Sequence, residues 1–332
     1  MKGSNVHYSI SIGLKIFQGI KNLKIVVGGG DGTVCSVLNY LTGGVVEEWK
    51  TNNPPVAVFP LGTGNDLSRA LGWGSGGEDC DPKLYLEELE KKGRQTSSDR
   101  GVMTISNPQS GDGEKVYTIY NYLGVGLDAR VCYDFHKVRE KYPSLFISPL
   151  SNKLIYTNMG ALDLFVKKGE VLIKDYIVVE VDGKVISLEG LENIVLLNIT
   201  HWAGGVSGLW KESAEFKPSS MNDGIIEILG VSDMLHLGQI QVGMDLPLQI
   251  SQGKEVTIKS IADCDMSFQI DGEPFQLKSP FLVKVAFKDK VNLLATSSPN
   301  PNEKMRRIID EAFEKAVIDR DQYQYLLGKL NS

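Results

Sequence analysis

Apolar residues in the first hundred positions gather in short runs, each followed by a glycine-rich turn and then by a mixed apolar and polar stretch. The runs are LKIVV at 23–27 and PVAVFP at 55–60, and both have the length and β-branched content of buried strands. TVCSVLNYLT follows the first turn and LSRALGW the second, as helices do in strand–loop–helix units. Two successive units predict a parallel, doubly wound α/β sheet whose loops emerge at one carboxyl edge, where ligands bind.

From about residue 101 the pattern changes to short β-rich runs separated by turns. The stretch YIVVEV-DG-KVISL at 176–188 is the clearest, because Asp-Gly favours the two-residue turn of a β-hairpin. We therefore expect an α/β domain over 1–100 and a β-rich, sandwich-like domain over 101–292. A polar break then leads to EKMRRIIDEAFEKAV, which predicts a helical tail within 293–332.

Composition narrows the class of protein. The chain has 332 residues, enough for two domains, with 42% hydrophobic and 23% charged residues. A net charge of −6 argues against nucleic-acid binding, whereas a local basic face could still meet a membrane surface. No run approaches the roughly 18 apolar residues of a membrane span. Four cysteines without a CxxC pair favour a reducing, cytoplasmic compartment and no zinc site.

The two glycine turns, GGGDG at 28–32 and LGTGND at 61–66, predict a phosphate-binding edge. Glycines let backbone amides approach an anion, and a helix N-terminus adds positive partial charge. Neither turn has the Gly-Lys-Ser/Thr of a Walker loop, and Thr33 stands where a dinucleotide fingerprint needs its third glycine. The predicted phosphate-binding residues are Gly29, Gly30, Asp31, Gly32, Thr33, Gly62, Thr63, Gly64, Asn65 and Asp66.

Asp31 is out of place in such a turn, because its carboxylate would repel a bare phosphate. It is explained if Mg²⁺ lies between the two, or if the carboxylate accepts a hydrogen bond from a ribose hydroxyl or a neighbouring amide. The loop therefore predicts a metal-bound nucleotide, with Asp31 as a candidate Mg²⁺ ligand.

A second pair of carboxylates, Asp271 and Glu273, lies in IDGEPF. Asp-Gly pairs are usually turns, and those at 112 and 182 are assigned to hairpins. If the stretch at 271–273 is extended, however, its two carboxylates point to the same side. Paired carboxylates raise the pKa of one member, which suits a general base.

At this point the residues resemble the eukaryotic diacylglycerol kinases, lipid kinases related to phosphofructokinase and NAD kinase. GGGDGTV and PLGTGNDLSRALGWG are similar to the catalytic domain of that family. NYLGVGLDARVCYDFHKVREKYPSLF, SNKLIYTNMG, LLNITHWAGGVSGLW, DGIIEILGV and FQIDGEPFQL are similar to its accessory domain, in the same order. The resemblance covers roughly residues 23–292.

The resemblance implies a Mg²⁺-dependent transfer of the ATP γ-phosphoryl group to the hydroxyl of diacylglycerol, giving phosphatidic acid for lipid signalling. It implies an ATP-binding first domain, an accessory domain closing over the cleft, and a chain end that returns to the first domain. By the DGEP match, Asp271 is the general base and Glu273 its orienting partner. Asp223 matches a structural Mg²⁺ ligand of bacterial relatives, but Ser220 replaces their second carboxylate, which favours a turn.

Partners and rival functions follow from the same resemblance. Diacylglycerol implies peripheral membrane contact, and FHKVREKYPSLF at 135–146 either faces lipid headgroups or forms a charged helical face. His201 and Trp202 either line the cleft or pack in the core. The family's Asn-Pro-x-Ser-Gly-Gly loop is missing from 1–22, which favours a nucleotide- or lipid-binding pseudo-kinase as one alternative. A ceramide or sphingoid-base kinase, or more remotely an NAD kinase, is the other.

Overall fold

The fold is described from a computed structural model. The described residues are 12–44, 46–50, 52–76, 81–107, 113–142, 172–211, 213–296, 309, 312–313 and 317–330. The predicted turn at Asp112 and most of the predicted helix at 303–317 lie outside them.

The predicted strand–loop–helix units are confirmed in the first part of the chain. Strands β1 (Ile25–Gly29) and β2 (Val56–Pro60) are parallel, and every residue of β2 is buried. They form one end of a mixed sheet, so the carboxyl ends of both strands lie at the same edge. Three helices accompany them: α2 (Asp31–Thr42), α3 (Asp66–Ala70) and α4 (Pro82–Lys92).

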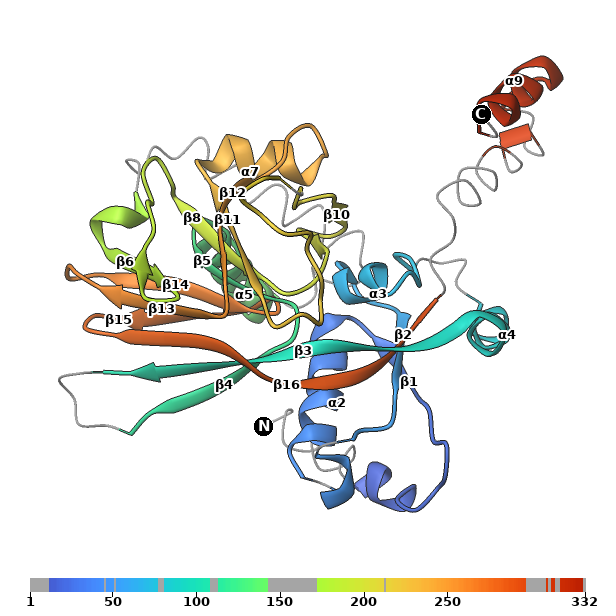
Figure 1. Ribbon diagram of the computed structural model, residues 1–332, viewed down its shortest axis with the longest axis horizontal. Helices are drawn as coiled ribbons and strands as arrows, with labels where there is room; N and C mark the ends of the chain where they lie inside the picture. Colours follow the sequence, from blue (N-terminus) through green and yellow to red (C-terminus); the bar gives the residue numbers. More distant parts are fainter. Residues whose placement is uncertain are drawn as a thin grey trace.

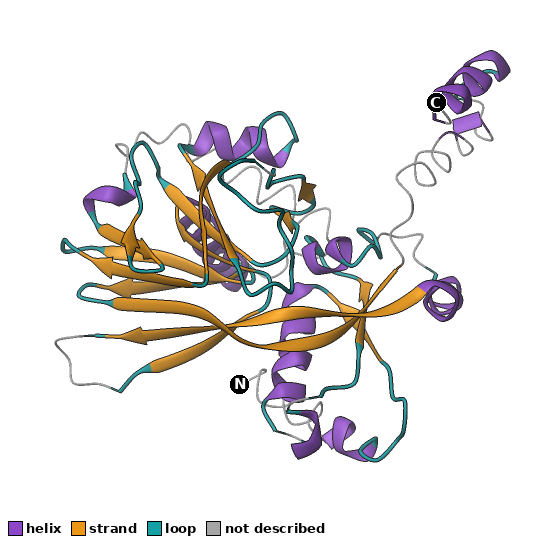
Figure 2. Cartoon of the chain, in the orientation of Figure 1, coloured by secondary structure: helices purple, strands orange, loops and turns teal. Residues whose placement is uncertain are grey.

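The second part of the chain is β-rich, as predicted, and Figure 2 shows how strands dominate it. Its six-stranded sheet has the order β12-β11-β8-β5-β14-β15 and is antiparallel throughout. The predicted hairpin at 176–188 is confirmed, with Asp182 and Gly183 at positive φ between β6 and β7. Bounds are β4 (Lys115–Ile119), β5 (Tyr122–Gly126), β6 (Ile177–Val181), β7 (Lys184–Val185), β8 (Asn193–Leu197), β9 (His201–Trp202), β10 (Val206–Ser207), β11 (Ile226–Val231), β12 (Leu248–Gly253), β13 (Glu255–Ser260), β14 (Asp265–Ile270) and β15 (Glu273–Lys278).

Two long antiparallel strands connect the parts (Figure 1). β3 (Gly93–Ser106) pairs with β16 (Leu282–Thr296) along its whole length. One end of β16 pairs with β13 of the accessory half, and its other end runs parallel to β2, with Leu293 opposite Val56. The predicted boundary between residues 100 and 101 therefore falls inside β3.

Two apolar cores explain why the β8 strand is buried on both faces. Val195 and Leu197 pack in a core that includes Val34 and Leu38 of α2. Ile194 and Leu196, on the opposite face, pack between the two sheets. Because neighbouring strand residues point to opposite faces, one strand contributes to both cores.

Further helices are α5 (Leu127–Lys141), α7 (Met234–Gln241) and α9 (Arg320–Leu330), with single turns at Glu47–Trp49 and Ile173–Asp175. The hydrophobic pattern did not single out α7. Figure 1 shows α9 apart from the sheets, joined to them by a segment outside the described residues, so the packing of the tail stays a prediction. No helix within the described ranges is long and apolar enough to cross a membrane.

Asp128 gives this fold a measurable pH dependence. Its buried carboxylate accepts a hydrogen bond of 2.6 Å from Gln269 Nε2, and burial raises its pKa to about 7. The folded state therefore binds this proton more tightly than the unfolded state does, so the unfolding free energy decreases as the pH rises from about 4 to 7. We expect Asp128→Asn to reduce that slope by up to about 1.4 kcal/mol per pH unit in urea unfolding. The exposed Asp175→Asn is the control, and an unchanged slope in Asp128→Asn would contradict the assignment.

Candidate active site

The two glycine loops meet at the carboxyl edge of β1 and β2, as the sequence predicts. The amide of Leu61 donates to the carbonyl of Gly29 over 3.1 Å. A Cβ on Gly62 would lie 2.4 Å from Gly30 Cα, and a Cβ on Gly30 would lie 3.0 Å from Gly62 Cα. Only glycine permits this approach of two backbones.

Asp31 joins the two loops. It is the first residue of α2, and its Oδ2 and Oδ1 accept hydrogen bonds from the amides of Asp66 (3.0 Å) and Leu67 (3.1 Å). Burial raises the pKa of Asp31, and these amides act in the opposite direction. Of the explanations that the sequence left open, the structure shows the bond to neighbouring amides, while the role in Mg²⁺ binding stays a prediction.

Asn65 shapes the second loop from within. Its φ of 54° is left-handed, and its side chain exchanges two hydrogen bonds with the backbone of Gly62, at 2.9 and 2.8 Å. Its Nδ2 also donates to Ser75 O over 2.7 Å. Thr63, at the outer side of this loop, is exposed. The loop is thereby fixed before any ligand arrives.

Asp66 reaches the accessory half of the molecule. Its side chain is buried, Oδ2 accepts a 3.3 Å hydrogen bond from the amide of Gly204, and Oδ1 has no hydrogen-bond partner among the described residues. Burial, and then the charge of Asp31, raise the pKa of Asp66 to about 7. This buried oxygen is a free acceptor beside Asp31.

Asp271 lies in a turn, so the extended stretch on which the same-side argument depended is not formed there. Asp271 and Gly272 have φ angles of 50° and 88° and connect β14 to β15, with Ile270 opposite Glu273. Asp-Gly adopts this two-residue turn because both residues tolerate positive φ. The same-side argument for Asp271 and Glu273 therefore fails. Unlike an ordinary turn aspartate, however, Asp271 is only 8% exposed.

The carboxylate of Asp271 is held by the backbone between β4 and β5. Its Oδ2 accepts from the amide of Tyr120 (3.0 Å), and its Oδ1 accepts from those of Asn121 (2.7 Å) and Tyr122 (3.0 Å). The thiol of Cys35 donates to Oδ2 over 3.5 Å. Burial raises the pKa of Asp271 to about 6, and the amides limit the increase. We call residues 120–122 the amide cradle.

Glu273 lies at the surface on the other side of the turn. A Cβ on Gly32 would be 3.6 Å from Glu273 Oε1, so this carboxylate lies beside the first turn of α2. The structure thus brings both predicted catalytic carboxylates to the helix that begins at the glycine loop.

The weaker sequence candidates lie elsewhere. Asp223 Oδ1 accepts a hydrogen bond from the amide of Ile225 over 3.0 Å, which is the geometry of a local turn. Among the residues that the structure describes, no group of three metal-ligating side chains is arranged to hold a metal. Trp202 is 2% exposed and packs in the core, whereas His201 is half-buried.

Sequence reasoning missed the amide cradle and Gly204. Backbone amides can belong to any residue type, so the cradle has no signature of its own. Gly204 and Gly205 have φ angles of 81° and 118°, and the Gly-Gly pair after Trp202 was the available signal of an unusual backbone.

Comparisons with known proteins agree with this layout. Residues 11–97 match the diacylglycerol kinase catalytic domain, and residues 118–274 match the diacylglycerol kinase accessory domain. The chain is 33% identical over 336 residues to diacylglycerol kinase 1 of Arabidopsis thaliana, covering 96% of this chain and 44% of that protein. It is 31% identical over 304 residues to human diacylglycerol kinase theta, covering 87% of this chain and 31% of that protein. The chain thus spans less than half the length of these relatives.

The fold has a solved counterpart. A Bacillus anthracis protein provisionally named a diacylglycerol kinase superposes with a TM-score of 0.51 at 18% identity, covering 87% of this chain and 83% of that one. At this identity the likeness supports the fold alone.

The contact between the loops can be tested with two glycine substitutions. We expect Gly62→Ala to lower the unfolding free energy by about 1–3 kcal/mol, because its Cβ would press on the backbone of Gly30. Gly32→Ala is the matched control: its Cβ lies in the first turn of α2 at van der Waals distance from Glu273, so stability should stay equal or rise by up to about 1 kcal/mol. Urea unfolding measures both, and equal stability of the two variants would refute the close approach.

Proposed function

The chain belongs to the diacylglycerol kinase family, and on that basis we propose that it transfers the γ-phosphoryl group of ATP to the hydroxyl of 1,2-diacylglycerol, giving phosphatidic acid. One observation supports this function most: the buried carboxylate of Asp271 contacts Cys35 in the helix that starts at the glycine loop. Phosphoryl transfer requires mainly such positioning, together with charge neutralisation.

The proposed nucleotide site is the edge formed by the two glycine loops. The N-terminus of α2, a helix of 12 residues, directs amides and positive partial charge toward an anion. The proposed contact residues are Gly29, Gly30, Asp31, Gly32, Thr33, Gly62, Thr63, Gly64, Asn65 and Asp66.

Mg²⁺ bound with the nucleotide would neutralise phosphate charge. The unpartnered Oδ1 of Asp66 fits this role, because a buried carboxylate oxygen beside Asp31 is a hard oxygen ligand in an acidic environment. Asp31 would add its remaining lone pairs. A structural Mg²⁺ at Asp223 is the weaker proposal, since Ser220 supplies no charge.

Asp271 is the proposed general base. As the lipid hydroxyl oxygen bonds to the γ-phosphorus, the bond from that phosphorus to its bridging oxygen breaks, ADP leaves, and the hydroxyl proton passes to Asp271. With a pKa near 6 the carboxylate is ionised at neutral pH. The thiol of Cys35 is the weakest of its four donors, so Oδ2 retains the most capacity to accept. Glu273 is the proposed orienting partner.

The remaining assignments are proposals as well. They comprise a doubly wound ATP-binding domain over 1–100, an accessory domain over 101–292, a C-terminal tail over 293–332, and peripheral contact with the cytoplasmic face of a membrane. The membrane contact follows from the proposed substrate, because diacylglycerol resides in the bilayer.

The function is tested by incubating the protein with labelled ATP, Mg²⁺ and mixed micelles of diacylglycerol, ceramide and sphingosine. We expect label in phosphatidic acid alone. Label in ceramide or sphingosine phosphate would assign another lipid substrate, and ATP binding without any labelled lipid would indicate a pseudo-kinase.

The role of Asp271 has its own test. We expect Asp271→Asn to reduce kcat by about 10²–10⁴-fold, the range of general acid–base catalysis, with ATP affinity nearly unchanged in calorimetry. Asp182→Asn is the matched control, since Asp182 occupies the same kind of Asp-Gly turn and accepts the amides of Lys254 and Glu255 at 3.0 and 2.9 Å. Urea unfolding checks that both variants fold. Equal loss of kcat and ATP affinity in Asp271→Asn would exclude the role as base.

A further inference from the structure

Helix α2 carries three polar residues on one face: Cys35, Asn39 and Thr42. Their spacing of four and three positions places them one above the other along the helix. The neighbouring residues Val34 and Leu38 are fully buried in the apolar core. We call the three residues the polar stripe. The proposed nucleotide site explains none of them, since all three lie beyond the glycine loop.

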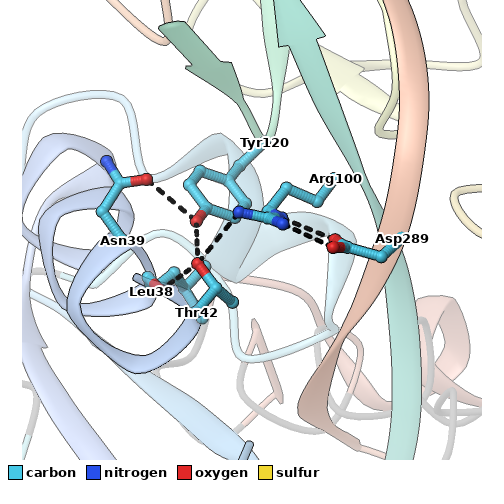
Figure 3. A network of polar contacts seen from close by, with 6 residues as sticks. All are labelled: Leu38, Asn39, Thr42, Arg100, Tyr120 and Asp289. Atoms are coloured by element: carbon cyan, nitrogen blue, oxygen red, sulfur yellow. Dashed lines mark hydrogen bonds and ion pairs between the residues drawn. The ribbon is translucent and has the colours of Figure 1, made fainter. Parts of the chain in front are cut away.

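Each member of the polar stripe contacts the amide cradle or the carboxylate that it holds. Cys35 donates to Asp271 Oδ2 over 3.5 Å, and Asn121 Nδ2 lies 3.9 Å from the Cys35 sulfur. The hydroxyl of Tyr120 donates to Asn39 Oδ1 over 3.0 Å and lies 3.4 Å from Thr42 Oγ1 (Figure 3). The stripe therefore contacts the cradle along more than one turn of α2.

Thr42 also connects the stripe to the long strands. Its hydroxyl donates to the carbonyl of Leu38 over 2.9 Å, so its oxygen is available to accept from Arg100 Nη1 at 3.3 Å. The guanidinium of Arg100 in β3 donates hydrogen bonds to both carboxylate oxygens of Asp289 in β16 (Figure 3). A bidentate arginine–carboxylate pair has a defined geometry. The Arg100 donor that Thr42 Oγ1 accepts is therefore held in place by Asp289.

Tyr120 is the residue in which these contacts converge. Its side chain is 2% exposed and reaches α2, while its amide donates to Asp271 Oδ2 over 3.0 Å. Its carbonyl accepts from Asn198 Nδ2 over 2.6 Å. The phenol of one residue thus contacts the polar stripe of α2, while its backbone amide binds the proposed general base. Tyr120 therefore links α2 to the carboxylate of Asp271 through its own hydrogen bonds.

We infer that the polar stripe and the Tyr120 hydroxyl are a positioning device, which fixes Asp271 relative to the N-terminus of α2. The inference rests on the proposed function, in which α2 binds phosphate and Asp271 accepts the lipid proton. Reacting groups must be held within a fraction of an ångström, and a misplacement of about 1 Å can cost about 10²-fold in rate. The residues of the device contact no substrate; they act through Asp271.

Tyr120→Phe is the sharpest variant, because it removes the hydroxyl and leaves the ring in the core. We expect kcat to fall by roughly 10-fold or more, while KM for ATP changes by less than about 2-fold. Tyr117→Phe is the matched control: Tyr117 lies on β4, is 40% exposed and stacks on Phe275, so its kcat should stay at the wild-type value. Thr42→Val should lower kcat as Tyr120→Phe does. The variant with both substitutions should lose less kcat than the product of the two single fold-losses, because each substitution disrupts the same positioning device.

Hydrogen exchange at the amides of 120–122 provides a readout that does not depend on activity. In Tyr120→Phe these amides should exchange faster than in the wild type, and in Tyr117→Phe they should not. If the wild-type protein phosphorylates no lipid, the proposed function fails, and exchange alone then decides whether the stripe holds the cradle. Wild-type kcat in folded Tyr120→Phe, or equal exchange in both variants, would overturn the inference.

Discussion

A carboxylate that is buried away from water must be given hydrogen-bond donors, and this constraint determines how the two halves of the molecule meet. Asp31 takes its donors from the second glycine loop, Asp66 takes one from Gly204, and Asp271 takes three from the amide cradle. In each case the carboxylate and its donors come from segments far apart in the chain. Satisfying the buried charges therefore requires the loops, the cradle and α2 to lie in one relative arrangement.

The long ladder of β3 and β16 supplies the frame in which this arrangement is held. The two strands pair from Gly93 to Ser106 and from Leu282 to Thr296, with one register shift between Phe287 and Asp289, so a single ladder runs through both halves. The apolar core on α2 adds to this, since residues of β8 and β11 belong to the same core as the buried residues of the helix.

Two Asp-Gly turns whose aspartate has a positive φ show which features of a turn can be predicted from sequence. Asp182 and Asp271 have nearly the same φ, and both accept backbone amides. The first is an exposed hairpin tip, and the second is buried against α2 beside Cys35. A dipeptide can predict the turn, because the tolerance for positive φ is local. It cannot predict the burial, because that depends on which helix lies opposite.

The sequence by itself determined the two strand–loop–helix units and the β-rich second half of this protein, which follow from hydrophobic period and turn chemistry. It also marked the loop glycines at 30 and 62, although the close approach that requires them is a tertiary contact. Only the tertiary structure decided that Asp31 binds the second loop, that Asp271 stands in a turn with Glu273 apart from it, and that Tyr120 joins α2 to the cradle. These contacts join residues 35 to 151 positions apart, and most of them use backbone amides. No residue type encodes such contacts, because every residue except proline has the same N–H to offer.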